Sequence, residues 1–327
     1  MQKSISKIGV LTSGGDAPGM NACIRAVVRT GIYHEIEMMG VMKGYQGLID
    51  NEFIPLPSHA VSNIIQRGGT ILKTARCMEF KTPEGRRKAF DNLKAAEVDA
   101  LIVIGGDGTF SGADVFSREF GFPVIGIPGT IDNDLFGTDF TIGFDTANNS
   151  VIHAIDQIRD TAASHNRLFF VEVMGRDAGV IALWAGIAGG SEAILIPEKE
   201  TAIDSLIEKL TEGAENQKSS SIVVVAEGEK SGGALKIAEE VKRRFDHYDT
   251  KVTVLGHLQR GGSPTCFDRV LASRMGYAAV KALLNNVSGK MIGMVNNRVR
   301  FTELSLAISR HSPFDEELAE IAKVLSI

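Results

Sequence analysis

The sequence predicts an α/β fold built on parallel β-sheets, in a chain long enough for two domains. Short apolar runs alternate with stretches of helical spacing along most of the chain, and this alternation is typical of parallel strands joined by helical crossovers. Glycine-rich turns follow several of the apolar runs, at the sheet edge where open α/β folds bind their ligands. At 327 residues the chain can bury two cores of ordinary size.

The composition is that of a globular protein and argues against several classes of function. The hydrophobic fraction is 44%, the charged fraction is 23% and the formal net charge is -5, which argues against nucleic acid as a partner because phosphate backbones bind basic surfaces. No apolar run reaches the roughly 18 residues of a membrane span, and the first 16 residues lack a secretory apolar core. We therefore expect a cytoplasmic protein without a membrane partner. Cys23, Cys77 and Cys266 are too scattered to predict disulfides or structural zinc.

The first predicted strand, residues 7–12, leads into the turn SGGDAPG at residues 13–19 and then into a helix predicted over residues 20–32. A glycine-rich turn between a strand and a helix directs backbone N–H groups and a helix amino end towards phosphate. The turn matches neither the GxxxxGK[ST] nor the GxGxxG nucleotide motif. A tight turn without a ligand therefore remains an alternative.

Two further segments carry candidate nucleotide contacts. A second strand, residues 37–42, precedes a predicted loop over residues 43–47 that contains Tyr45; its ring could stack on a base or anchor the loop at the surface. Residues 66–76 contain two adjacent glycines and three cations, a composition suited to binding a polyphosphate. Arg76 is the candidate ligand, because a guanidinium can bind phosphoryl oxygens through two hydrogen bonds.

The next predicted strand, residues 100–104, is apolar throughout, as expected of a strand buried on both faces. It leads into the sequence GGDGT at residues 105–109, where glycine backbone could approach a phosphate. Asp107 could hold Mg²⁺, which usually takes one or two carboxylates together with substrate oxygens.

The predicted strand over residues 122–127 leads into PGTIDND at residues 128–134, the candidate for the chemistry itself. Asp132 and Asp134 suit a pair of roles, one as a general base and the other as its electrostatic partner. Asp and Asn after a strand also commonly form turns by bonding their own backbone, so a purely structural role remains open here.

The second half of the chain continues the alternation of strands and helices. A strand from residue 167 ends at Gly175 and Arg176, and the only tryptophan, Trp184, is expected in the core.

His257 and Arg260 form a candidate phosphate pocket, although a lone histidine is usually structural. The tetrapeptide QRGG occurs at residues 66–69 and 259–262, which does not make a repeat. Further strands are predicted over residues 193–196, 221–226 and 252–255, and helices over residues 142–164, 202–215, 235–245, 267–284 and 314–325.

Taken together and in this order, the motifs LTSGGDAPGMN, RGGT with TAR, VIGGDGT, PGTIDND, EVMGR, AEGE and GHLQRGGSP closely resemble those of the bacterial ATP-dependent 6-phosphofructokinase family, from about residue 7 to residue 284. The resemblance implies ATP-dependent phosphorylation of the 1-hydroxyl of fructose 6-phosphate, the committed step of glycolysis. It also implies a homotetramer with active sites shared between subunits. Each subunit would have two doubly wound, mostly parallel domains, with residues 1–142 and 259–309 binding ATP and residues 143–258 and 310–327 binding fructose 6-phosphate.

The resemblance assigns roles to individual residues. Asp132 would be the base, oriented by Thr130 and Asp134, and Arg76 and Arg176 would complete the catalytic set. ATP and Mg²⁺ would be bound by Gly15, Tyr45, Arg76, Cys77, Gly106, Asp107, Gly108 and Thr109, with Asp107 as the metal ligand. Fructose 6-phosphate would be bound by Thr130, Ile131, Asp132, Arg167, Met174, Gly175, Arg176, Glu227, Lys251, His257, Leu258, Gln259 and Arg260, with Arg167 supplied by the neighbouring subunit.

Several positions bear on specificity and regulation. Gly108 and Gly129 are expected to leave space for the nucleotide phosphates and so to select ATP over pyrophosphate. Lys251 replaces an arginine of the family and loses its fork, so Lys251→Arg should tighten sugar-phosphate binding; the resemblance gives Lys73 no role. An effector site would use Arg25, Arg29, Arg159, Glu192 and Lys218, and Ser58 and Asn216 replace two of its cations. We expect weakened regulation, measurable as a small shift of the fructose 6-phosphate saturation curve by phosphoenolpyruvate.

Two other functions remain open on the sequence. Another kinase with a GGDG motif, such as an NAD kinase or a lipid kinase, would account for residues 105–109, but EVMGR and GHLQRGG supply cations suited to a sugar phosphate. A regulatory subunit that only binds nucleotide should lack the base or the metal ligand, and both Asp132 and Asp107 are present.

Overall fold

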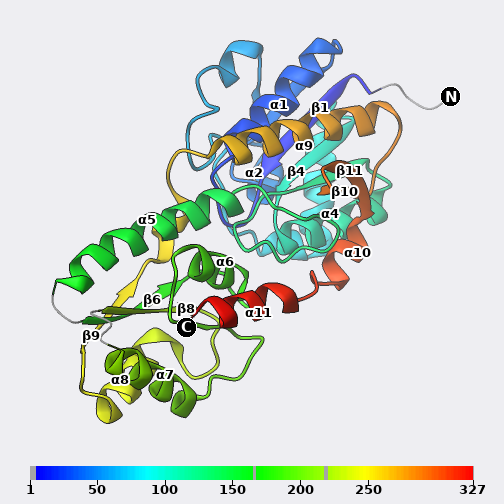
Figure 1. Cartoon of the computed structure of the whole chain (residues 1–327). Coiled ribbons are helices and arrows are strands. Elements are labelled where there is room, and N and C mark those ends of the chain that lie inside the picture. The colour runs from blue at the N-terminus through cyan, green and yellow to red at the C-terminus, as the bar shows by residue number, and fades with distance from the viewer. Residues whose placement is uncertain (1–4, 165–166, 217–219, 327) are drawn as a thin grey trace. The chain divides into compact units, whose positions relative to one another are not determined.

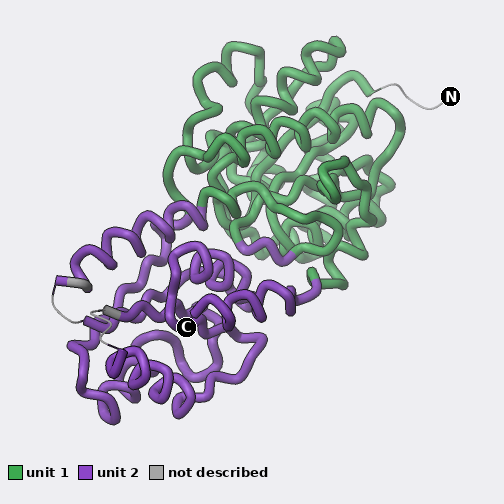
Figure 2. Tube along the Cα trace, viewed as in Figure 1, with its two compact units in different colours: residues 1–131, 135–146, 260–312 green, residues 132–134, 147–259, 313–327 purple. Residues whose placement is uncertain are grey.

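A computed structural model describes residues 5–164, 167–216 and 220–326. The chain forms two compact units (Figure 2). Unit 1 comprises Met1–Ile131, Leu135–Thr146 and Arg260–Ser312, and unit 2 comprises Asp132–Asp134, Ala147–Gln259 and Pro313–Ile327. Each unit is therefore assembled from segments that are distant in the sequence.

Unit 1 contains a seven-stranded sheet of order β11-β10-β5-β4-β1-β2-β3. Its inner strands are parallel, and β3 and β11 are antiparallel edge strands. The chain builds outward from β1 in one direction and then returns to add β4 on its other side, so the carboxyl ends of β1 and β4 form a topological switch point. The strands are β1 (Lys7–Thr12), β2 (Glu37–Val41), β3 (Phe53–Pro55), β4 (Ala100–Gly105), β5 (Val124–Pro128), β10 (Lys290–Val295) and β11 (Arg298–Glu303).

Helices cover both faces of this sheet. Helices α1 and α9 lie side by side along one face (Figure 1), and α2, α3, α4 and α10 bury an aromatic-rich cluster around Phe110 and Phe116 on the other. With both faces covered, β4 is buried along its whole length. The helical elements are α1 (Met20–Tyr33), α2 (Tyr45–Asp50), α3 (Pro83–Ala95), α4 (Asp107–Phe120), α9 (Cys266–Leu284), α10 (Leu304–Ser309) and the 3-10 turns η1 (Ser58–Val61) and η2 (Glu79–Lys81).

Unit 2 contains a parallel four-stranded sheet of order β7-β8-β6-β9. Helices α7 and α8 pack on one face around Leu210 and Val241, whereas α6 packs against β8 and α11 packs against α6. Strand β6 lies between β8 and β9, so their carboxyl ends are adjacent. The elements are α5 (Phe144–Ala163), which begins in unit 1, β6 (Arg167–Val173), α6 (Val180–Ala188), β7 (Ala193–Leu195), α7 (Ile203–Glu215), β8 (Ser220–Ala226), α8 (Gly233–Arg244), β9 (Asp249–Val254), η3 (Gly256–Arg260) and α11 (Glu316–Leu325).

The structure confirms the predicted fold class of two mostly parallel α/β sheets with helices on both faces. It also corrects two local expectations. Trp184 is 41% exposed rather than buried in the core, because the helix on which it lies turns this residue away from the sheet. The segment predicted as a loop over residues 43–47 ends in α2, which begins at Tyr45.

In the described parts of the chain, every helix is either too short or too polar to cross a lipid bilayer.

Candidate active site

Two glycine-rich turns lie against each other at the switch point of unit 1. Thr12 and Ile104 are register partners at the ends of β1 and β4. The Ser13 N–H donates to the Ile104 carbonyl at 3.0 Å, and the Thr109 hydroxyl donates to the Ser13 carbonyl at 3.0 Å. A side chain at Gly105 would collide with the Ser13 carbonyl and the Thr109 hydroxyl. The two turns that the sequence analysis singled out separately are thus one structural unit.

Asp107 and Gly108 form the open part of this unit. They are the first residues of α4, and the partial positive charge at a helix amino end stabilises a carboxylate or a bound phosphate there. A Cβ built on Gly108 meets no atom within 4 Å, so space is available for a ligand beside the carboxylate. Among the described residues, no group of three or more His, Cys, Asp and Glu side chains is placed to hold a metal ion.

Gly129 does not provide the open space that the sequence analysis expected. A Cβ at Gly129 would lie 2.9 Å from a methyl group of Ile104 and 3.1 Å from the terminal methyl of Met20. The absence of a side chain is therefore required by packing between β5, β4 and α1. Space for nucleotide phosphates depends on Gly108 instead.

Arg260 lies on the first glycine-rich turn. Its guanidinium donates to the Asp16 carbonyl at 3.1 Å, and a Cβ on Gly15 would lie 2.5 Å from the Nη1 atom of Arg260. The bare face of Gly15 is therefore covered by this cation. The structure places Arg260 with the residues expected to bind ATP in unit 1, whereas His257 belongs to unit 2.

The segment carrying Arg76 is anchored to unit 1 by a buried asparagine. The Asn21 amide donates to the carbonyls of Arg67 and Gly68, each at 3.1 Å, and its oxygen accepts from the Ile71 N–H at 2.8 Å. Asn21 is 1% exposed, so these bonds are shielded from water. They fix the path of the chain over residues 67–71.

Further along this segment, the Thr12 hydroxyl donates to the Lys73 carbonyl at 3.0 Å. Lys73 itself has a left-handed backbone conformation, with φ of 60°, and its side chain is exposed, as is that of Arg76. Cys77 is half-buried, and burial raises the pKa of its thiol.

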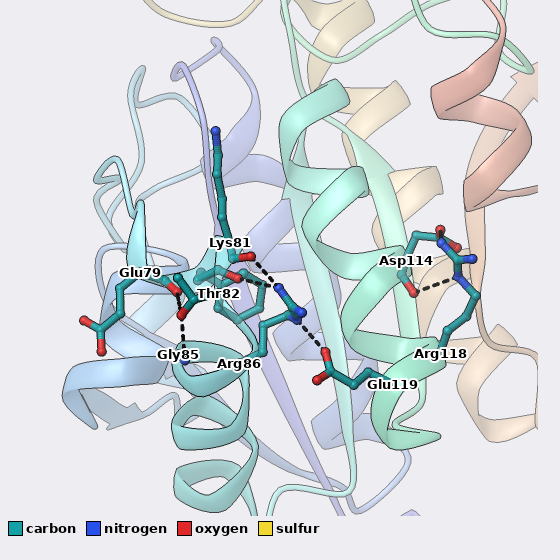
Figure 3. A network of polar contacts seen from close by, with 9 residues as sticks. Glu79, Lys81, Thr82, Gly85, Arg86, Asp114, Arg118 and Glu119 are labelled. Carbon is teal, nitrogen blue, oxygen red and sulfur yellow. Dashed lines mark hydrogen bonds and ion pairs between the residues drawn. The ribbon is translucent and has the colours of Figure 1, made fainter.

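The downstream end of the segment is held by a polar network between η2, α3 and α4 (Figure 3). Arg86 donates to the Lys81 carbonyl at 2.8 Å and pairs with Glu119 of α4 at 2.5 Å. Thr82 caps α3 by accepting the Gly85 N–H at 3.1 Å. The exposed side chain of Arg76 is therefore carried between two anchored ends.

Tyr45 is not placed to stack on a base. Its side chain is 6% exposed, its ring stacks on Phe80 with centroids 4.0 Å apart, and its hydroxyl donates to the Thr109 carbonyl. Burial raises the pKa of the phenol. The Tyr45 hydroxyl therefore supports the GGDGT turn, because the Thr109 carbonyl to which it donates belongs to that turn.

The PGTIDND segment divides between the two units, with Thr130 and Ile131 in unit 1 and Asp132 and Asp134 in unit 2. The Thr130 carbonyl accepts from the Thr141 hydroxyl at 2.6 Å. Ile131 is fully buried, so its side chain is not available to a substrate and the expected contact is limited to its backbone. Both aspartates are half-buried.

The loops after β6 and β8 meet in unit 2 as the resemblance to the family implied. Arg176 has a left-handed conformation, with φ of 56°, and its N–H donates to Glu227 at 2.7 Å. Gly175, with φ of 142°, approaches the Ala178 carbonyl too closely for a side chain. Glu227 thus holds the backbone of Arg176. The Arg176 side chain is exposed and lies 3.3 Å from the carboxylate of Asp177, and Met174 on the same loop is half-buried.

His257 and Leu258 lie exposed in η3, after β9. Gln259 is fully buried and donates to the Gly256 carbonyl at 3.2 Å. The expected contact between the Gln259 side chain and a substrate is therefore not available in this packing.

Arg167 and Lys251 lie together at the opposite end of the unit 2 sheet. Lys251 pairs with Asp249 at 2.9 Å, and Arg167 lies 3.7 Å from the same carboxylate. The hydrogen bond from Lys251 is the largest cause lowering the pKa of Asp249. At roughly 3.3 Å per residue, the length of β6 separates Arg167 from the Gly175–Arg176 end by about 20 Å. These two cations therefore cannot join Arg176 around one small ligand within a single chain.

The expected effector residues of unit 1 lie on α1 and η1, which pack together. Arg25 and Arg29 are one helical turn apart, and burial followed by the charge of Arg29 lowers the pKa of Arg25. Ser58 begins η1 and is exposed.

In unit 2, Arg159 donates to the Gly190 carbonyl at 2.9 Å, and Glu192 accepts from the Ile222 N–H of β8 at 2.5 Å. Asn216 ends α7. Lys218 lies outside the described residues.

Several residues that support the site were missed on the sequence. Thr141 and Asp268 belong to none of the motifs, and Asn21 ends the motif LTSGGDAPGMN without an assigned role. Their roles depend on partners up to 125 positions away in the chain, as for Asp268 and Gly143. Their only local signal is that they are polar residues next to glycine-rich turns or helix starts.

Comparisons with known proteins identify the family to which the chain is similar. A family model described as Phosphofructokinase matches residues 7–283. The chain is 55% identical over 324 residues to the ATP-dependent 6-phosphofructokinase 2 of Bacteroides thetaiotaomicron, covering 99% of each chain. It is 54% identical over 323 residues to the ATP-dependent 6-phosphofructokinase 1 of Thermus thermophilus, covering 99% of this chain and 100% of that one.

Among solved structures, phosphofructokinase from Pichia pastoris in the T-state superposes with a TM-score of 0.89 at 36% identity over 94% of this chain. The present chain spans 36% of the length of that protein. The family model covers most of the chain, and the bacterial relatives are more than half identical along nearly their whole length. The chain therefore belongs to the phosphofructokinase family.

Proposed function

We propose that this protein is an ATP-dependent 6-phosphofructokinase that transfers a phosphoryl group to the 1-hydroxyl of D-fructose 6-phosphate, giving fructose 1,6-bisphosphate and ADP. The curated bacterial relatives carry this name at 55% and 54% identity. The structural observation that carries the proposal is the paired glycine-rich turn of unit 1, in which Asp107 stands at a helix amino end beside the open face of Gly108.

ATP would bind along this turn through its phosphates. Phosphoryl transfer needs positioning and charge neutralisation more than covalent help from the protein. Asp107 and the open space next to it fit a magnesium ion that reaches the site with the nucleotide, since Mg²⁺ commonly combines one carboxylate with phosphate oxygens. The metal would neutralise charge on the phosphates, and Arg76 would do so from its anchored segment.

The sugar would be activated by Asp132. In this proposal the carboxylate accepts the proton of the 1-hydroxyl, and Thr130 and Asp134 orient it. Arg176 would bind the sugar from a backbone that Glu227 holds in place at 2.7 Å. His257 would bind the 6-phosphate. Arg260, which donates to the Asp16 carbonyl at 3.1 Å, would lie next to the glycine-rich turn that binds the nucleotide.

We further propose that the enzyme is a homotetramer, in which Arg167 and Lys251 bind the 6-phosphate in a neighbouring subunit's site. Arg167 begins β6, about 20 Å from its carboxyl end by strand length, and Lys251 reaches the same end of the sheet through its pairing with Asp249. This position supports such sharing. Cytoplasmic location remains part of the proposal.

The activity is tested with the purified chain and with Asp132→Ser. We expect ATP-dependent phosphorylation of fructose 6-phosphate by the wild type and a loss of kcat of at least about 100-fold in the variant, since general base catalysis commonly contributes this much. Asp156→Ser, at an exposed position of α5, is the matched control and should retain full activity.

The same assay distinguishes other acceptors and donors. NAD and diacylglycerol should not be phosphorylated, and pyrophosphate should not replace ATP. Undiminished turnover by Asp132→Ser, or equal rates with pyrophosphate, would contradict the assignment.

A further inference from the structure

Asp268 is a fully buried carboxylate at the start of α9 that bonds chiefly to the start of another helix. It is 0% exposed. One oxygen accepts the Gly143 N–H at 2.8 Å, and the other accepts the Thr146 N–H at 2.9 Å and the Thr146 hydroxyl at 2.5 Å. Gly143 immediately precedes α5, and Thr146 is its third residue. Asp268 therefore caps α5 from α9, using both carboxylate oxygens.

The start of α9 is bonded back to α5 in return. The Thr265 N–H donates to the Thr146 hydroxyl oxygen at 3.0 Å, and the Thr265 hydroxyl donates to Asp145 at 2.5 Å. The Thr265 hydroxyl oxygen also accepts the Asp268 N–H at 3.2 Å, which caps α9. Asp268 thus caps α5, Thr265 caps α9, and hydrogen bonds from Thr265 to Asp145 and Thr146 join the two helix starts within unit 1.

This junction is joined directly to the proposed catalytic segment. The Ile142 N–H donates to the Pro128 carbonyl at 2.9 Å, and the Thr141 hydroxyl donates to the Thr130 carbonyl at 2.6 Å. Gly143 follows at once, in a left-handed conformation with φ of 104°, and its N–H is held by Asp268. The backbone of residues 141–143 is therefore fixed on one side to residues 128–130 and on the other to Asp268.

The junction is joined equally to the segment that carries Arg260. Arg269, next to Asp268 in α9, donates to the Pro264 carbonyl at 2.8 Å and to the Ser263 hydroxyl at 2.9 Å. Ser263 donates in turn to the Gln66 carbonyl at 2.8 Å. The two QRGG tetrapeptides lie against each other here, and a Cβ on Gly68 would collide with the Gly262 carbonyl. Residues 260–265 are therefore as firmly held as residues 128–131.

We propose that Asp268 is a positioning residue that fixes the catalytic segment around Thr130 relative to the segment around Arg260. This inference rests on the proposed phosphotransfer and deepens it, because it assigns a role in that reaction to a residue that touches no substrate. A shift of about 1 Å in a catalytic group can cost on the order of 100-fold in rate. A rigid link between two substrate-binding segments is where such a shift would matter most.

The chemistry of the group supports this role. Burial is the largest cause that raises the pKa of Asp268, and the bonds from Thr146 and Gly143 oppose the rise. An asparagine would avoid the cost of burying a charge but has only one acceptor oxygen, and its NH₂ group would face donors on one side. Only a carboxylate accepts from Gly143 and Thr146 at the same time.

The test compares Asp268→Asn with Asp99→Asn. Asp99 also accepts two backbone N–H groups and one hydroxyl, from Ser6 and Lys7, at 2.9, 3.1 and 2.8 Å, but all three bonds go to its Oδ2 atom, and it lies before the amino end of β4. The single amide oxygen of an asparagine can keep these bonds, so Asp99→Asn removes the charge without removing the acceptor. We expect kcat to fall about 10- to 100-fold in Asp268→Asn. The Kd for Mg-ATP in the absence of sugar, measured by calorimetry, should change by less than about twofold, which corresponds to about 0.4 kcal/mol. Asp99→Asn, which keeps the acceptor oxygen, should keep the wild-type kcat.

Thr146→Val and Thr146→Ser provide a second pair in case Asp268→Asn fails to fold. The first removes the hydroxyl between Asp268 and Thr265, and the second keeps it. A lower kcat in Thr146→Val with wild-type kcat in Thr146→Ser supports positioning through this junction.

The proposal is overturned if folded Asp268→Asn keeps wild-type kcat, if Asp99→Asn loses as much kcat, or if the two Thr146 variants are equal. Failure of the proposed function would be seen separately, as absence of turnover in the wild type.

Discussion

At the scale of single residues, the site depends on where a side chain is missing as much as on where one is present. Gly105, Gly129 and Gly15 lack side chains because protein atoms occupy the space. Gly108 differs, since nothing lies within 4 Å of a Cβ built there. A glycine that packing does not require, in the first turn of a helix, costs helix stability. Its presence indicates that a ligand needs the space.

We therefore predict opposite effects of Gly108→Ala on stability and on nucleotide binding. Alanine should raise the free energy of unfolding of the unliganded protein by up to about 1 kcal/mol, because it favours the helix. It should also raise KM for ATP, because the methyl group enters the space beside Asp107. Denaturant unfolding and initial rates at varied ATP measure the two effects.

Gly213→Ala, within α7 of unit 2, is the control for Gly108→Ala. It should leave KM for ATP unchanged, because it lies outside the proposed nucleotide site. Unchanged KM in Gly108→Ala would mean that the open face of Gly108 is not a nucleotide contact.

Residue types in short motifs could be predicted from the sequence, and their surroundings could not. Asp107 follows a strand in a glycine-rich turn, a local pattern that the chain itself displays. Tyr45, Ile131 and Gln259 sit in equally suggestive motifs, yet their side chains are buried against partners remote in the sequence. Burial of one residue in a motif depends on tertiary packing, which local sequence does not encode.

At the scale of elements, the segment over residues 66–76 shows how a loop without regular structure is held in place. In place of the hydrogen bonds of a helix or strand, the Asn21 side chain donates to two backbone carbonyls at 3.1 Å and accepts from one backbone N–H at 2.8 Å. The network around Arg86 holds the far end (Figure 3). Arg76 can then present a long, flexible side chain from a fixed backbone.

Asn21→Ala should therefore both destabilise the protein and weaken ATP binding. Three buried hydrogen bonds are lost, which we expect to cost roughly 3 kcal/mol in unfolding free energy. KM for ATP should rise, because the backbone that carries Arg76 is released. Equilibrium unfolding and steady-state kinetics provide the measurements.

Asn92→Ala is a matched control for Asn21→Ala, because the Asn92 amide also donates to two carbonyls, those of Leu48 and Ile49, at 2.8 and 2.9 Å. It should lose stability and keep its KM for ATP. If both variants raise KM equally, the effect follows from general loosening rather than from the Arg76 segment.

Elements with strong periodicity were predictable, and weakly patterned ones were not. Helix α9 was expected over residues 267–284 and is Cys266–Leu284. Strands β10 and β11 were not foreseen, although β10 contains a short buried run over residues 291–294. Strand β11 is an edge strand whose residues are mostly exposed. It lacks the apolar run that marked β4. Its place in the sheet is set by pairing with β10, and pairing is a property of two segments.

At the scale of the whole molecule, the chain divides each proposed function between distant segments. Unit 1 combines the first part of the chain with the distant segment Arg260–Ser312, and Asp132–Asp134 belong to unit 2 although the residues on both sides belong to unit 1. Such interleaving cannot be read from local pattern. It was expected here only through resemblance to a family.

The position of Arg167 and Lys251 leads to a prediction about the assembly. The charged groups of both cations lie at the amino end of the unit 2 sheet, where Lys251 pairs with Asp249 at 2.9 Å and Arg167 lies 3.7 Å from the same carboxylate, whereas Arg176 lies beyond the carboxyl end of β6. If Arg167 serves a neighbouring subunit's site, an Arg167→Ala chain and an Asp132→Ser chain can complement each other. Each is inactive alone, but a mixed tetramer contains sites with both groups intact.

We expect that co-expressed Arg167→Ala and Asp132→Ser chains, purified as hybrids, regain about one quarter of the wild-type rate, because random mixing supplies each required chain with a probability of about one half. The control pairs Arg176→Ala with Asp132→Ser. In the proposed site these two groups come from the same chain, so no hybrid site contains both and activity should stay at the level of the single variants. Recovery of activity in the control pair, or no recovery in the Arg167→Ala pair, would contradict the proposed arrangement of Arg167, Arg176 and Asp132. Strand β6 keeps Arg167 and Arg176 at its opposite ends. Recovery of activity only in the Arg167→Ala pair would therefore mean that a second subunit completes the active site.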